Sequence, residues 1–224
     1  MAITVTPITT HIGGRMTGID VRRPLTPDEV KAVDAGMDKY AVLVLPGQDI
    51  TDEQQIAFTR NFGPLQNGAN ATLKQPELRL DPAFADVSNI GKDGQKLARD
   101  DRRRMASLGN RLWHSDASFR VIPARYSILS GRIVVSEGGN TEFADMRAAY
   151  DALDAATKAE VEDLVCEHSL IFSRGQPSMA PMCDDRNSDF RPDEGWVRTS
   201  RWRTGFMATR SSGRNSVKPS CPRE

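Results

Sequence analysis

The stretch Trp113-His-Ser-Asp-Ala-Ser-Phe119 places a histidine and a carboxylate two residues apart. In an extended segment alternate side chains share one face, so we expect His114 and Asp116 to project into the same space. An imidazole beside a carboxylate supplies two of the three protein ligands of a 2-His-1-carboxylate site, which holds Fe(II) and leaves coordination positions open. The alternative is a partly exposed histidine hydrogen-bonded to a nearby aspartate. Taken by itself, the triplet favours that alternative, and the choice depends on the rest of the chain.

Length, charge and cysteine usage narrow the class of protein. The 224 residues suit one domain with a sizeable core. Lysine plus arginine equal aspartate plus glutamate at 30 each, so no net charge favours nucleic acid or an acidic membrane as a partner. Neither a signal peptide nor an apolar run of about 18 residues is present. The three cysteines include no Cys-x-x-Cys pair, which argues against a disulfide framework or a zinc ribbon. We therefore expect a cytoplasmic protein.

Local signals predict both helices and strands. Thr26 with Pro27 and Glu29 predicts a capped helix to about Lys39, and Thr51-Asp-Glu-Gln54 opens a second. Two more helices are expected at 147–153 and 155–164, with Asp154 as a cap between them. Strands are expected at 2–8, 16–21, 40–45, 84–90, 124–135, 141–146 and 165–172, with turns at 91–94 and 138–139. Strands this far apart in sequence, with a metal motif between them, suit an antiparallel barrel or jelly roll flanked by helices.

The last 49 residues, 176–224, differ in composition from the rest. They contain no leucine or isoleucine, but eight arginines, seven serines and five prolines. Such a segment buries too little apolar surface to offset its ordering entropy. It could be a disordered basic arm, a binding tail, or the product of a reading-frame change that replaced the original C-terminus. We favour the frame change, because the shift is abrupt and falls where a barrel still needs strands, and we divide the chain into a partial domain at 1–175 and an atypical tail at 176–224.

Five segments carry a resemblance to a known family: Gln54-Gln-Ile-Ala-Phe58, Arg60-Asn-Phe-Gly-Pro-Leu65, Leu112-Trp-His-Ser-Asp116, Pro123-Ala-Arg-Tyr-Ser127 and Gly138-Gly-Asn-Thr-Glu-Phe-Ala-Asp-Met-Arg-Ala-Ala-Tyr-Asp-Ala-Leu153. Over about residues 10–175 the chain resembles the TauD/TfdA family of Fe(II)- and 2-oxoglutarate-dependent dioxygenases, in particular its 2,4-dichlorophenoxyacetate branch. The resemblance implies a double-stranded β-helix, or jelly roll, with flanking helices. This is an α+β, mainly β fold, and here it would be incomplete at the C-terminus.

The resemblance also implies roles for individual residues. His114 and Asp116 match the first two iron ligands, and Thr141 matches the threonine that hydrogen-bonds the distal carboxylate of 2-oxoglutarate. The second metal histidine and the 2-oxoglutarate arginine of the family have no match in the C-terminal third. The other histidines, His11 and His168, lie away from the family's metal position, and we expect neither to be a ligand.

The implied reaction uses Fe(II), 2-oxoglutarate and O₂ to hydroxylate an aryloxyalkanoate, giving a phenol, glyoxylate, succinate and CO₂. The substrate carboxylate needs a cationic partner, for which Lys74 and Lys96 are candidates, although solvated surface lysines are the simpler interpretation. Trp113 and Phe119 are expected to pack in the core. A second hypothesis is a non-catalytic remnant with an incomplete metal site. We expect the binding partner to be a small carboxylic acid and expect no binding to nucleic acid or membrane. The sequence leaves the formation of a homo-oligomer undecided.

Overall fold

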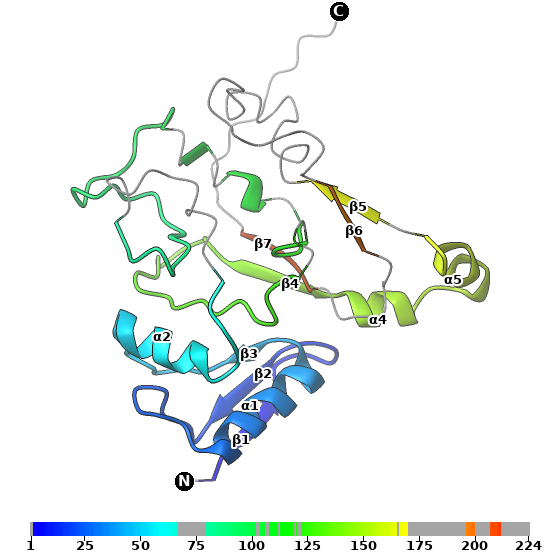
Figure 1. The fold of residues 1–224 in the computed structure, drawn as a ribbon, viewed down its shortest axis with the longest axis horizontal. Helices are drawn as coiled ribbons and strands as arrows, with labels where there is room; N and C mark the ends of the chain where they lie inside the picture. Colours follow the sequence, from blue (N-terminus) through cyan, green and yellow to red (C-terminus); the bar gives the residue numbers. More distant parts are fainter. Residues whose placement is uncertain are drawn as a thin grey trace, which may run out of the picture.

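The chain mixes short strands with short helices in two regions (Figure 1). The computed structural model describes residues 2–66, 79–101, 104–105, 108–111, 113–118, 120 and 122–164, and three strand segments at 166–169, 196–199 and 207–211. Within these ranges, no helix has the length and apolar character needed to cross a bilayer.

The N-terminal region is a three-stranded sheet with two helices. Strand β1 (Thr4–Pro7) runs antiparallel to β2 (Gly14–Thr17), and β2 runs parallel to β3 (Leu43–Val44). Helix α1 (Pro27–Tyr40) makes the crossover that a parallel pair requires. The strand expected at 2–8 is confirmed. The one expected at 16–21 stops early, because Gly18 adopts φ +81°, a left-handed conformation that ends the extended run.

Both N-terminal helices begin as their capping residues predicted. The Thr26 hydroxyl accepts from the amide of Glu29, whose carboxylate accepts from the amide of Thr26. Helix α2 (Asp52–Arg60) starts with the same reciprocal pair between Thr51 and Gln54. Each of these reciprocal pairs is a capping box, and it satisfies amide groups that the first turn of a helix leaves without a partner.

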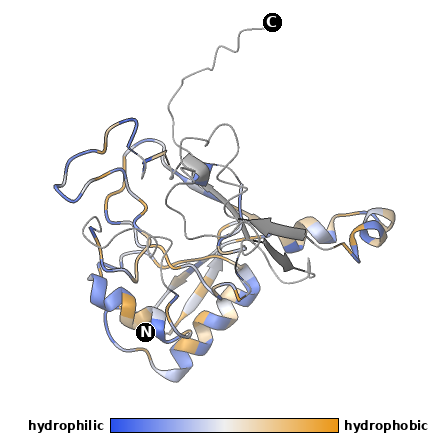
Figure 2. Cartoon of the chain, turned by 45° about the horizontal axis from the view of Figure 1, so that its top comes forward, coloured by the Kyte–Doolittle hydropathy of each residue, from blue (hydrophilic) through white to orange (hydrophobic). Residues whose placement is uncertain are grey.

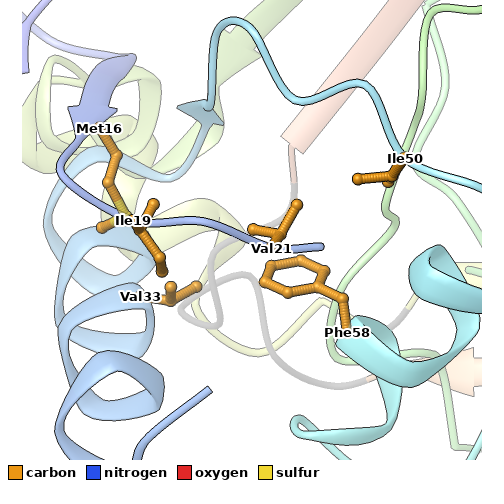
Figure 3. Packing of buried hydrophobic residues seen from close by; sticks show 6 residues of the cluster. All are labelled: Met16, Ile19, Val21, Val33, Ile50 and Phe58. Carbon is orange, nitrogen blue, oxygen red and sulfur yellow. The ribbon is translucent and has the colours of Figure 1, made fainter. Parts of the chain in front are cut away.

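The buried core lies between these elements (Figure 3). Hydropathy colouring shows the apolar residues of α1 and α2 alternating with charged ones along each helix, as an amphipathic helix requires (Figure 2). The most deeply buried apolar side chains all come from the first 60 residues: Met16, Ile19, Val21, Val33, Ile50 and Phe58. The core that the structure describes therefore belongs to the N-terminal region, and the later segments attach to it.

The second region contains two strand pairs and two short helices. Strand β4 (Thr141–Asp145) pairs antiparallel with β7 (Met207–Ser211), and β5 (Cys166–Ser169) pairs antiparallel with β6 (Trp196–Thr199). Helices α4 (Met146–Asp151) and α5 (Ala155–Val161) follow β4 and confirm the two helices predicted there, with Asp154 capping α5. Strands β6 and β7 lie beyond residue 175, in the segment of unusual composition.

Three further predicted strands are wrong in whole or in part. Residues 84–90 contain only an isolated bridge from Ile90 to Lys96, closed by the predicted turn at 91–94. Helix α1 continues through Tyr40 and ends at Ala41 with φ 60°, which leaves two strand residues where six were expected. Residues 124–135 form no strand, because side chains rather than a backbone ladder attach them to the N-terminal region.

Candidate metal centre

The predicted proximity of the histidine and the carboxylate is observed. A short 3-10 helix, η3 (Leu108–Arg111), leads into the motif. The His114 Nε2 atom lies 3.3 Å from Asp116 Oδ1. Immediately afterwards Ala117 adopts φ 55°, so the chain turns at the end of the motif. The side chains at alternate positions therefore meet in one place, although their role as ligands stays a prediction.

The carboxylate of Asp116 is held in its ionised form. A hydrogen bond with His114 is the largest cause that lowers the pKa of Asp116, partial burial opposes it, and a hydrogen bond from Ser127 lowers the pKa further. The side chains are 31% exposed for His114 and 54% exposed for Asp116, so a ligand can reach both. An accessible carboxylate that stays ionised can bind a cation without first losing a proton.

These two side chains fit part of a ferrous site. One imidazole nitrogen and one carboxylate oxygen are ligand types that suit non-haem Fe(II) and Mn(II). In the part of the chain that the structure describes, no group of three or more His, Cys, Asp or Glu side chains is placed to hold a metal ion. His11 is exposed between β1 and β2. The pair therefore supplies two ligands of the three that the predicted site requires.

The other predicted site residues lie on separate segments of the chain. Thr141 is the exposed first residue of β4, opposite Ser211 of β7. Strand β7 also contacts η3, so the ladder that carries Thr141 borders the segment that leads into the motif. Lys96 is exposed at its bridge with Ile90. Lys74 lies outside the described residues.

Sequence reasoning did not single out Ser127, which helps to lower the pKa of Asp116 and lies 11 residues further along the chain, in the Pro123–Ser127 segment that contributed to the family resemblance. A separate expectation was wrong: Trp113 is 48% exposed, so it does not pack in the core. Phe119 lies outside the described residues.

Several characterised proteins are similar to this chain. It is 42% identical over 174 residues to the alpha-ketoglutarate-dependent 2,4-dichlorophenoxyacetate dioxygenase of Cupriavidus pinatubonensis, covering 78% of this chain and 61% of that protein. It is 37% identical over 179 residues to the (S)-phenoxypropionate/alpha-ketoglutarate-dioxygenase of Sphingobium herbicidovorans, covering 78% of this chain and 56% of that protein. The chain thus spans about three fifths of the length of these relatives.

A solved structure gives the same result. The crystal structure of AAD-2 in complex with Mn(II) and N-oxalylglycine superposes with a TM-score of 0.77 at 51% sequence identity, covering 89% of this chain and 68% of that one. The model of the Taurine catabolism dioxygenase TauD, TfdA family matches residues 4–216, which is nearly the whole sequence. With an imidazole and an ionised carboxylate side by side inside that match, the chain belongs to the TauD/TfdA family.

Proposed function

We propose that this chain is an Fe(II)- and 2-oxoglutarate-dependent dioxygenase of the aryloxyalkanoate-hydroxylating type. The observation that carries the proposal is the pair of His114 and Asp116, 3.3 Å apart and accessible, within a chain of the TauD/TfdA family. Relatives named for 2,4-dichlorophenoxyacetate and phenoxypropionate support the substrate class, an aryl ether with a carboxylate.

The residues of this chain would act by binding and orienting. His114 would hold the metal through a ring nitrogen and Asp116 through its carboxylate, and Thr141 would donate its hydroxyl to the distal carboxylate of 2-oxoglutarate. When bound, iron and 2-oxoglutarate together would activate O₂ for hydroxylation of the carbon next to the ether oxygen. Lys74 and Lys96 are retained as candidates for pairing the substrate carboxylate.

The fold and cellular setting complete the proposal. We infer that the small sheets are parts of a jelly roll and that the enzyme acts in the cytoplasm on a small carboxylic acid. The charge balance gives no reason to invoke nucleic acid or a membrane. Subunit association stays open.

One experiment tests the metal role directly. Anaerobic addition of Fe(II) and 2-oxoglutarate should give the weak visible charge-transfer band of an iron–keto acid chelate. His114→Ala and Asp116→Asn should each abolish the band. The matched control His11→Ala removes an exposed imidazole outside the motif and should keep it. A band of equal strength in Asp116→Asn would contradict the assignment.

A non-catalytic remnant is the second candidate function. It is favoured by the observation that the described residues offer two ligands and no group of three. Two ligands alone retain iron poorly, so we expect little or no succinate from the isolated chain with Fe(II), 2-oxoglutarate, ascorbate and 2,4-dichlorophenoxyacetate. Rapid turnover by the isolated chain would exclude the remnant.

The boundary near residue 175 is also retained as a proposal, with 1–175 as the domain and 176–224 as a frame-changed tail. Two observations weigh against it: β6 and β7 pair with β5 and β4, and the family match extends to residue 216. Sequencing the coding region and translating all three frames decides the matter. An alternative frame that restores a regular hydrophobic pattern supports the frame change, and its absence refutes it.

A further inference from the structure

The guanidinium of Arg147 lies between the end of β4 and the end of helix α1. It donates to the carboxylate of Asp145, the last residue of β4, through Nε at 3.0 Å and Nη2 at 2.8 Å. The remaining nitrogen, Nη1, donates to the backbone carbonyl of Asp38 in α1 at 2.6 Å, across 109 residues of sequence. This Arg147 bridge therefore joins the strand that begins at Thr141 to the N-terminal region.

Both acceptors of the Arg147 bridge suit a cation. The Asp38 carbonyl is one of the last four of α1, which have no acceptor role within the helix, and the C-terminus of a helix has a partial negative charge. The Asp145 side chain is 8% exposed and also accepts from the Arg147 amide in the first turn of α4. Its hydrogen bonds with Arg147 lower the pKa of Asp145, and burial opposes them. A planar guanidinium can bind the carboxylate and the carbonyl at the same time.

The same end of α1 also holds the segment that follows the metal motif. Asp34 lies one turn before Asp38, so the two residues share one side of the helix. Its carboxylate accepts from the Tyr126 hydroxyl at 2.8 Å and pairs with Arg125 at 3.4 Å. The last turns of α1 thus contact the segment that follows the metal motif and the segment that follows Thr141.

We propose that Arg147 is a positioning residue for Thr141, because it fastens the end of β4 to the helix that also holds the segment after the motif. Thr141 lies at the other end of this five-residue strand, about 13 Å away, so a small rotation at Asp145 displaces the Thr141 hydroxyl. This inference rests on the proposed function, which assigns Thr141 to 2-oxoglutarate. Without the bridge fewer molecules hold the hydroxyl in place, and the apparent affinity falls with that fraction.

Binding of 2-oxoglutarate to the full chain in excess Mn(II), measured by calorimetry, tests the proposal. We expect Arg147→Met to raise the 2-oxoglutarate dissociation constant about tenfold, because the charged hydrogen bonds to both segments are lost. Arg147→Lys keeps the charge but reaches one acceptor at a time, so its constant should lie between those of the parent and Arg147→Met. The control Lys158→Met removes a cation that donates to the Asp151 carbonyl, a contact that does not involve α1, and should change nothing.

The Mn(II) dissociation constant should be the same in all four proteins, because the metal pair lies on another segment. A rise in the 2-oxoglutarate constant of equal size in Lys158→Met, or none in Arg147→Met, would overturn the proposal. A parallel loss of Mn(II) affinity in Arg147→Met would also overturn it, because that result indicates a general loosening of the fold. A parent-like constant in Arg147→Lys would show that the charge alone suffices and would overturn the bridging role.

A metal-free distance measurement separates this inference from the proposed function. Spin-labelled unnatural amino acids at Ala35 of α1 and Ala149 of α4, both exposed, report the separation of the two helices by pulsed electron paramagnetic resonance. We expect a narrow distance distribution in the parent and in Lys158→Met, and a broader one in Arg147→Met. An unchanged distribution in Arg147→Met overturns the inference whether or not 2-oxoglutarate binds. Failure of the parent to bind 2-oxoglutarate, together with the expected broadening, refutes the proposed role of Thr141 and leaves the Arg147 bridge between β4 and α1 supported.

Discussion

At the scale of single residues, Tyr126 connects the segment after the motif to the N-terminal region. Its hydroxyl donates to Asp34, its ring packs 5.5 Å from that of Phe62, and the Arg125 guanidinium lies 4.9 Å from its ring centre. Burial, followed by the hydrogen bond to Asp34, raises the pKa of Tyr126 to about 12. The folded state therefore favours the neutral phenol strongly.

Tyr126→Phe should lower the free energy of unfolding by about 1 kcal/mol, because it removes one hydrogen bond and keeps the ring contacts. Urea denaturation followed by circular dichroism measures the change. Tyr150→Phe on α4, whose ring lies beneath Lys158, is the control and should leave the midpoint in place. Equal losses in the two variants would show that the bond to Asp34 contributes nothing specific.

The same phenol makes stability depend on alkaline pH. Because folding raises the pKa of Tyr126, its contribution is complete below the ordinary value of 10.0 and is lost as the pH rises through about 12. We expect the unfolding free energy to fall across that interval, and to fall less steeply in Tyr126→Phe. Urea midpoints between pH 9 and 12 measure this, and parallel curves for the two proteins would refute it.

At the scale of elements, the capping box of α1 also sets a dependence on acid. Hydrogen bonds from Arg23 and from the Thr26 amide lower the pKa of Glu29 to about 2 from 4.5. A lowered carboxyl pKa gives stability that is complete above 4.5 and is lost as the pH falls towards 2. Glu29→Gln keeps a capping side chain, so its unfolding midpoint should change less over that range. Asp28→Asn, next to it on the exposed face, should follow the parent curve.

The elements that could be predicted from sequence are those with local causes. Thr26, Thr51 and Asp154 cap helices three residues or fewer away from the amides they bind, and all three helices were predicted. The strands expected at 84–90 and 124–135 required partners far along the chain, which β propensity does not supply. Residues 124–135 are instead attached to the N-terminal region by Arg132, which donates to the Ile50 carbonyl and to Asp52.

The candidate site likewise combines a feature with a local cause and a feature that depends on distant contacts. His114 and Asp116 meet because of a spacing of two, which the sequence displays. The position of the segment that follows the motif depends on where α1 and α2 hold the chain, and the Tyr126–Asp34 pair that helps to set this spans 92 residues. No local sequence pattern predicts a contact between residues so far apart in the chain.

Arg132 provides the element-scale test of that attachment. Arg132→Met removes its bonds to the Ile50 carbonyl, Asp52 and Gln55, and should cost about 1 kcal/mol, since the side chain is partly exposed. Arg99→Met, at an exposed position outside this network, is the matched control. Urea denaturation compares the two, and a loss no larger than that of the control would mean that Arg132 does not fasten the segment to α2.

At the scale of the whole molecule, the distribution of apolar residues is uneven. The described core is confined to the first 60 residues, whereas Ile133 and Val134 are 78% and 83% exposed. The formal net charge is zero, so repulsion between copies is weak. Exposed apolar side chains that lie next to one another favour association between chains through apolar contact.

Val134→Lys should therefore reduce self-association without lowering stability, because a charge in the exposed apolar run opposes apolar contact and the replaced side chain buries little surface. Sedimentation velocity at several concentrations would show a smaller share of oligomer in the variant. Ala149→Lys adds the same charge at an exposed position of α4 and separates the effect of location from that of net charge. If both variants reduce association equally, the effect comes from net charge alone. If only Val134→Lys does so, residues 133–135 are the surface through which copies of the chain meet.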